Sequence, residues 1–270
     1  MKVLFAKFNT ERLPEYDILT EIILNDNGSK SALKKPAAKA AEFHIKRIFR
    51  NYTLLREKYA LSLVEPVLLG NSVAFPLAEG KSLGVLLQNA VRNNDCASVK
   101  TMVDRYIAYV QSMTDESLRN TKFSPSQEFI DIFGKWTVKS PQDLIVLPNI
   151  DLIFSNLFVN DDKFTLIDYE WVFDFPVPAS FIIWRAFNIF AYFYDVDLRQ
   201  YGYGEYFRFH GCFSKMERNF CTYVYGSDFA QSPDIPLVRR VRNPLERGME
   251  SNRYWKFAKK NIKRILKGDD

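Results

Sequence analysis

The stretch NIDLIFSNLFVNDDKFTLIDYEWVF, residues 149–173, decides how this sequence is interpreted. It places Asp151 five residues before Asn156, and Asp168 follows at the end of a second apolar run. The polar residues 161–163 between the two runs are typical of a turn. The two runs would then form a hairpin that places Asn156 and Asp168 close together at its open end. Phosphoryl transfer needs a carboxylate that orients the attacking hydroxyl, and an Asn and an Asp that hold Mg²⁺ against phosphates. We therefore interpret Asp151 as the catalytic carboxylate and Asn156 and Asp168 as the metal ligands.

Composition excludes several other classes of protein. The chain has 270 residues, of which 47% are hydrophobic and 26% charged, so it is expected to be globular rather than disordered. Apolar runs fall short of the roughly 18 residues that a membrane helix needs. Three cysteines and two histidines without metal-binding spacing argue against a disulfide scaffold or a zinc site. We expect a reduced, cytoplasmic protein.

Patterns along the chain predict strands first and helices later. Residues 1 to about 35 are predicted to be strands, with a hairpin turn at 25–28, because Asn and Gly accept positive φ there. A long helix is predicted over 37–59, followed by strands at 61–69 and 72–77. The remaining predicted elements are helices at about 82–92, 97–113 and 126–133, short strands at 144–147, 157–159 and 164–167, and mostly helix beyond Pro178.

The segment 149–173 resembles the aminoglycoside and choline phosphotransferase branch of the protein-kinase-like fold. That branch carries His-Gly-Asp-x-x-x-x-Asn and then a strand ending in Ile-Asp-Phe/Trp-Glu. The corresponding residues here are Asn149-Ile150-Asp151, Asn156 and Ile167-Asp168-Tyr169-Glu170. Two weaker matches occur in the right order: 31–34, Ser-Ala-Leu-Lys, resembles the lysine strand, and 75–83 resembles the hinge between lobes. The resemblance covers about residues 1–195.

This resemblance implies an α+β, two-lobed protein-kinase-like fold. Residues 1–78 would form an N-lobe with an antiparallel sheet and one helix, and residues 79–270 a mostly helical C-lobe. ATP would lie between them, with its adenine against the backbone of Pro76 and Ala78. Lys34 would bind the α- and β-phosphates, and Mg²⁺ would be the metal.

Other implied residues depart from the family pattern. The helix glutamate that pairs with the lysine would be Glu42, with Glu57 as the alternative. Lys35 is a possible competitor of Lys34, although a strand would point it the other way. The loop between the first two strands lacks the glycines that usually cover the phosphates, so Arg12 could serve there as a phosphate ligand. Asn149 replaces the histidine that supports the catalytic loop.

A closer likeness is to the kinase domain of bacterial O-antigen chain-terminating enzymes, which phosphorylate a lipid-linked polysaccharide. Residues 167–178 and 183–185 carry this likeness. It implies a sugar or polysaccharide acceptor. Lys and Arg are concentrated toward the C-terminus, and residues 254–266 predict a basic amphipathic helix. That helix could contact an anionic membrane surface, or be an ordinary solvated or core-packed helix.

Other interpretations remain open at this point. The missing glycines and Asn149 also fit a pseudokinase that binds a partner protein. A small-molecule kinase acting on an aminoglycoside or choline-like cation is the second alternative. Asp151 and Asn156 could also be ordinary turn residues. Binding to nucleic acid is the weakest alternative, because no recognition motif accompanies the basic residues.

Overall fold

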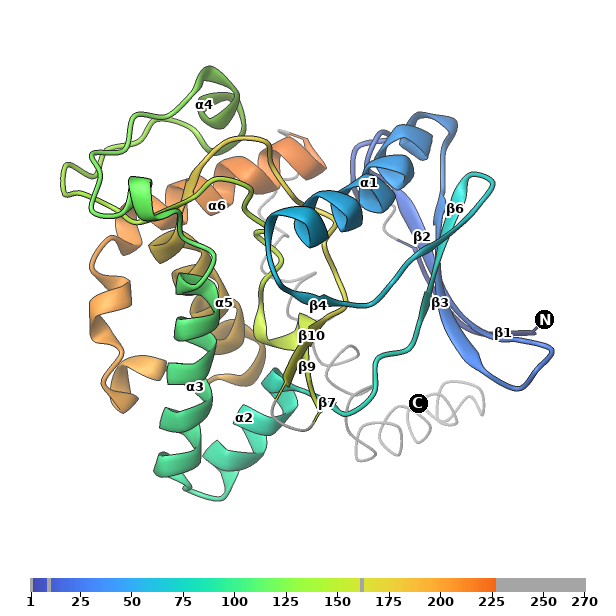
Figure 1. The fold of residues 1–270 in the computed structure, drawn as a ribbon, viewed down its shortest axis with the longest axis horizontal. Helices are drawn as coiled ribbons and strands as arrows, with labels where there is room; N and C mark the ends of the chain where they lie inside the picture. The colour runs from blue at the N-terminus through green and yellow to red at the C-terminus, as the bar shows by residue number, and fades with distance from the viewer. Residues whose placement is uncertain (1, 9–10, 161–162, 227–270) are drawn as a thin grey trace, which may run out of the picture. The chain divides into compact units, whose positions relative to one another are not determined.

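The N-terminal part of the chain is a five-stranded antiparallel sheet with the strand order β1-β2-β3-β6-β5 (Figure 1). The structure is a computed structural model that describes residues 2–8, 11–160 and 163–226. The strands are β1 (Lys2–Phe8), β2 (Ile18–Leu24), β3 (Lys30–Pro36), β5 (Val67–Leu69) and β6 (Ser72–Pro76). The predicted turn joins β2 to β3, and Gly28 has a φ of +81° there.

One helix packs against this sheet. A short 3-10 turn, η1 (Lys39–Ala41), leads into α1 (Glu42–Lys58), which contacts β3 and β6. Ile45, Ile48 and Leu55 are completely or almost completely buried, and their spacing places them on one side of the helix. This helix therefore joins the first part of the core and confirms the helix predicted over 37–59.

A second sheet combines strands from the N-terminal part of the chain with strands from the part that follows it. Its strands run in the order β4-β10-β9-β7, with bounds β4 (Ser62–Leu63), β7 (Lys81–Ser82), β9 (Leu157–Asn160) and β10 (Lys163–Leu166). The antiparallel pair β9–β10 is the hairpin predicted from residues 149–173. The single strand predicted at 61–69 is wrong, because β4 pairs in parallel with β10 whereas β5 pairs with β6. Pro66 lies between them and has no N–H to continue a ladder.

The rest of the described chain is mainly helical (Figure 1). The main helices are α2 (Leu83–Arg92), α3 (Cys96–Gln111), α4 (Gln127–Phe133), α5 (Ala179–Tyr194) and α6 (His210–Tyr225). The short pieces are η2 (Glu116–Leu118), β8 (Leu144–Ile145), η3 (Phe154–Asn156), β11 (Val177–Pro178), η4 (Leu198–Tyr201) and η5 (Gly204–Phe207). Aromatic side chains fill this region, and α5 is its most buried helix, with Phe181, Trp184 and Phe187 in the core.

The predicted α+β class, with an antiparallel N-terminal sheet and a mostly helical remainder, is confirmed. The boundary between lobes after residue 78 stays a prediction. Among the residues that the structure describes, none of the helices combines the length and the apolar character needed to cross a membrane. The predicted basic helix at 254–266 lies outside the described residues.

Candidate active site

The catalytic loop is the segment between β8 and β9, and its own side chains fix its shape. The Asn156 Nδ2 donates to the backbone oxygen of Asp151 at 3.0 Å. The Asp151 N–H donates to the Asn149 Oδ1 at 3.0 Å, and the Asn149 Nδ2 donates to the backbone oxygen of Asp168, also at 3.0 Å. Asn149 therefore supports the loop and links it to the segment that carries Asp168.

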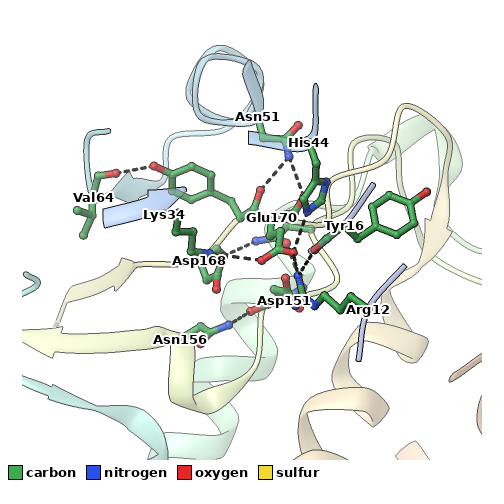
Figure 2. Close-up of polar contacts among 12 residues, drawn as sticks. Arg12, Tyr16, Lys34, His44, Asn51, Val64, Asp151, Asn156, Asp168 and Glu170 are labelled. Carbon is green, nitrogen blue, oxygen red and sulfur yellow. Dashed lines mark hydrogen bonds and ion pairs between the residues drawn. The ribbon is translucent and has the colours of Figure 1, made fainter. Parts of the chain in front are cut away.

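Lys34 and Asp168 meet although 134 residues separate them in the chain. The Lys34 Nζ donates to the Asp168 Oδ1 at 2.9 Å (Figure 2). Lys35 points to the other side of β3, because successive side chains of a strand alternate. Its Nζ forms an ion pair with the Glu21 Oε2 at 2.6 Å. Of the two lysines, Lys34 is thus the one that faces the predicted metal ligand.

A buried carboxylate, Glu170, receives three basic side chains (Figure 2). The Lys34 Nζ lies 3.4 Å from the Glu170 Oε2, and the His44 Nε2 lies 2.9 Å from its Oε1. Arg12 donates from Nη1 to the same Oε1. The Glu170 side chain is only 4% exposed. Three elements, β3, α1 and the loop before β2, therefore converge on this one carboxylate.

The predicted pairing of a helix glutamate with Lys34 is wrong. The side of α1 that faces the site carries His44 and Asn51, which are seven residues, or two turns, apart. Glu42 is the first residue of the helix and precedes His44 by two positions. Its side chain therefore points about 200° around the helix axis from that of His44. Glu57 is exposed in the last turn. The acidic partners of Lys34 come instead from the segment after β10.

Arg12 is bonded within the site in this structure, and its role as a phosphate ligand stays a prediction. Its guanidinium is bonded to Glu170, and its Nη1 also lies 3.3 Å from the backbone oxygen of Tyr16. The backbone of the segment after Asp168 is held as well, because the Asn51 Nδ2 donates to the carbonyl oxygen of residue 169 at 2.9 Å and to that of Glu170 at 3.1 Å. The surrounding residues thus fix both the side chain and the backbone of Glu170.

The charges of this cluster are set by their neighbours. Burial alone would raise the pKa of Glu170, but Arg12, Lys34 and the hydrogen bond from His44 outweigh it and hold that pKa well below its usual value. Burial likewise works against the charge of Lys34, yet Asp168 and Glu170 raise its pKa above the ordinary value. Both side chains are therefore charged at neutral pH.

Asp151 lies beside this cluster (Figure 2) and is held by Arg185 of α5. The Arg185 Nη1 lies 3.3 Å from the Asp151 Oδ1 and donates to the backbone oxygen of Ile150 at 2.7 Å. The Arg185 Nε donates to the Glu217 Oε2 at 2.8 Å. Burial, together with the charges of Asp168 and Glu170, raises the pKa of Asp151 to about 7 against the opposing effect of Arg185. A carboxylate near that pKa is suited to accept a proton.

The oxygen atoms of Asn156 and Asp168 fit the ligand preference of Mg²⁺. Because Asn156 donates its Nδ2 within the loop, its Oδ1 faces away from that bond. The Asp168 side chain is 28% exposed, the most accessible of the site carboxylates. Among the described residues, no group of three or more His, Cys, Asp or Glu could hold a metal by itself. Mg²⁺ in phosphate-binding sites typically takes one or two carboxylates and completes its shell with phosphates and water, so this sparse set is suitable.

The predicted hinge lies between the two sheets. Pro76 ends β6 and is exposed, and Ala78 lies half-buried between β6 and β7. Gly80 has a φ of +89°, and a Cβ there would lie 2.1 Å from the backbone oxygen of Val159. Only glycine fits this close approach, which fixes the chain leaving the hinge. Contact of adenine with Pro76 and Ala78 stays a prediction.

Sequence reasoning missed three residues of the site. The sequence assigns no role to His44, and Glu170 enters it only as part of the matched motif at 167–170. Arg185 occurs in the likeness at 183–185 without a role. The only signal for Arg185 was a cation within an otherwise apolar helix, where an unpaired charge would be costly.

Comparisons with known proteins give distant likenesses. No protein-family model matches the sequence, and no curated protein matches it. Among solved structures, the chain is similar to a type I macrolide 2′-phosphotransferase, at 10% identity and a TM-score of 0.45, over 88% of this chain and 90% of that one. An ethanolamine kinase of Plasmodium vivax is 12% identical, with a TM-score of 0.39, over 80% and 71%. An ADP-bound aminoglycoside phosphotransferase is 12% identical, with a TM-score of 0.34, over 90% and 93%.

Proposed function

We propose that this protein is an ATP- and Mg²⁺-dependent phosphotransferase that transfers the γ-phosphate to a hydroxyl group. The observation that carries the proposal is the 2.9 Å contact between Lys34 and Asp168, beside the loop that holds Asp151 and Asn156. A lysine, an Asp and Asn pair and a separate carboxylate are the four groups that kinase-type phosphoryl transfer uses. Here they come together from β3, the catalytic loop and the end of β10.

Each residue has a distinct part in the proposed reaction. Lys34 supplies a fixed positive charge for the phosphates, and its buried surroundings strengthen that interaction. Asn156 and Asp168 would hold Mg²⁺, which neutralises charge on the phosphates when it is bound. Asp151 orients the acceptor hydroxyl and accepts its proton, and Arg185 fixes the direction of that carboxylate.

For the acceptor, we propose a sugar hydroxyl of an envelope polysaccharide. Support comes from the likeness of residues 167–178 and 183–185 to O-antigen chain-terminating kinases. The same run contains Asp168 and Glu170, which contact Lys34, and Arg185, which contacts Asp151. Contact of residues 254–266 with an anionic membrane, where such an acceptor is anchored, is part of the same proposal.

Calorimetric titration tests the nucleotide site first. We expect ATP to bind the wild-type protein more tightly with Mg²⁺ than without, and Asp168→Ala to remove that dependence. Lys34→Met should weaken Mg-ATP binding about tenfold to a hundredfold, the usual effect of losing a hydrogen bond to a charged group. Lys35→Met is the matched control, because Lys35 faces Glu21, and should bind as the wild type does. A wild-type protein that binds no ATP would refute the proposal.

A transfer assay tests the acceptor. Radiolabel from [γ-³²P]ATP should pass to a lipid-linked O-antigen-type polysaccharide and depend on Asp151. Labelling of an aminoglycoside or of choline instead would identify a small-molecule kinase. Mg-ATP binding without transfer to any member of the panel would favour a pseudokinase.

A further inference from the structure

Lys34 has two carboxylate partners that differ in their accessibility. Asp168 is nearer, at 2.9 Å from the Lys34 Nζ, and its side chain is 28% exposed. Glu170 lies at 3.4 Å, and its side chain is only 4% exposed. A bound Mg²⁺ would draw on Asp168, because that carboxylate is the accessible one. Glu170 would then be the partner that remains on the lysine.

Glu170 is held in place independently of Lys34. His44 from α1 lies 2.9 Å from its Oε1, and Arg12 from the loop before β2 donates to the same oxygen. Asn51, two turns further along α1 than His44, holds the backbone carbonyl of Glu170 at 3.1 Å. Helix α1 therefore holds Glu170 and does not contact the lysine through a carboxylate of its own.

We infer that Glu170 is the positioning residue that directs Lys34 toward the nucleotide phosphates, in the place that a helix glutamate would otherwise fill. This inference rests on the proposed nucleotide-binding function. Residues from α1 and from the loop before β2 act through Glu170, since His44 and Arg12 bind the Oε1 and leave the Oε2 to the lysine. The lysine is then fixed by the same segment that carries the predicted metal ligand Asp168.

A purely structural role for Glu170 makes a different prediction. A buried carboxylate that only stabilises the fold could weaken nucleotide binding when it is removed, through general loosening. That loss would then add to the loss caused by removing Lys34. A residue that acts through Lys34 has no further effect once the lysine is gone, because contacting residues are coupled in double-mutant cycles.

The experiment is a double-mutant cycle of Glu170→Gln and Lys34→Met, with the Kd of Mg-ATP measured by calorimetry and the melting temperature recorded for each variant. We expect Glu170→Gln to weaken Mg-ATP binding about tenfold, as expected for a lost charge-assisted hydrogen bond. In the Lys34→Met background, Glu170→Gln should change the Kd less than twofold. Glu21→Gln is the matched control, because it removes a lysine–glutamate pair on the same sheet without touching Lys34.

Glu170→Asp keeps the inference testable if Glu170→Gln does not fold. The aspartate retains the negative charge, but its side chain is one methylene shorter, so the charge lies further from Lys34. The Mg-ATP affinity of Glu170→Asp should therefore lie between those of the wild type and Glu170→Gln. In the Lys34→Met background, Glu170→Asp should not change the affinity further. Wild-type affinity in both Glu170 variants would overturn the inference, and so would an equal loss with and without Lys34. If the wild-type protein binds no Mg-ATP, the proposed function itself fails, a result distinct from either of these.

Discussion

The ionised carboxylate of Glu170 predicts a stability difference that depends on pH. Its side chain is almost fully buried against Arg12, Lys34 and His44. Glu170→Gln keeps the shape but removes the carboxylate charge to which Arg12 is directly bonded. Removing one partner of a buried ion pair typically costs about 3–5 kcal/mol of unfolding free energy. Because Lys34 retains Asp168, we expect a loss of about 3 kcal/mol, at the lower end of that range.

The sign of the pH effect follows from the direction of the pKa shift. The pKa of Glu170 is lower in the folded protein than in the unfolded chain, where it is about 4.3. Its stabilising contribution is therefore complete well above pH 4.3 and is lost as the pH falls toward the folded pKa. Glutamine does not titrate. At a pH of about 3.5, the difference between wild type and Glu170→Gln should be about 1 kcal/mol smaller than at a pH of about 7.

Equilibrium unfolding in urea at both pH values measures this difference. Urea is preferred to guanidinium because it is uncharged and does not screen the ion pairs. Tyr106→Phe is a suitable control, since its expected loss comes from a neutral hydrogen bond and should be equal at both pH values. A Glu170→Gln variant as stable as the wild type at neutral pH, or one with the same loss at both pH values, would refute the reasoning.

Three further predictions concern other parts of the molecule. Asp151→Asn should lower kcat for transfer about 10²- to 10⁴-fold, the usual contribution of a general base, and leave the Kd of Mg-ATP within about twofold. Gly80→Ala should lower the melting temperature and reduce Mg-ATP affinity, because its Cβ would overlap the Val159 backbone oxygen; unchanged values for both would contradict this account. Tyr106→Phe should cost about 1–3 kcal/mol in urea unfolding, because its buried hydroxyl donates to the Leu152 backbone oxygen at 2.7 Å.

The parts of the fold and site that could be predicted from the sequence are those fixed by local patterns. The hairpin that carries Asn156 and Asp168 follows from two apolar runs around a polar turn, and the structure confirms it. The turn at Gly28 follows from the backbone freedom of glycine. Alternation along a strand predicts that Lys34 and Lys35 point to opposite sides of β3, but it does not say which side faces the site; the contact of Lys34 with Asp168 does.

The partners of long charged side chains could not be predicted in this way. Arg12 and Glu170 are 158 residues apart, and only the packing of the loop before β2 brings them together. The prediction that Glu42 pairs with Lys34 is wrong because the rotation of α1 about its axis decides which side chains face the site. His44 faces it, and Glu42, two residues earlier, points away. The split between β4 and β5 had a local cause in Pro66, but the choice of β10 as the partner of β4 is tertiary.

The short strand β4 has a consequence for the design of chimeras and for how the sequence evolves. It comes from the N-terminal third of the chain, yet it is a strand of the sheet that carries Asp168, with Leu63 opposite Leu166. The Tyr169 hydroxyl also donates to the backbone oxygen of Val64 at 2.8 Å. A chimera that joined residues 1–78 to the remainder of another such protein would lose this pairing unless both sequences matched across it. The two portions are therefore not readily exchanged between proteins. Substitutions at 62–64 should covary with substitutions at 165–169.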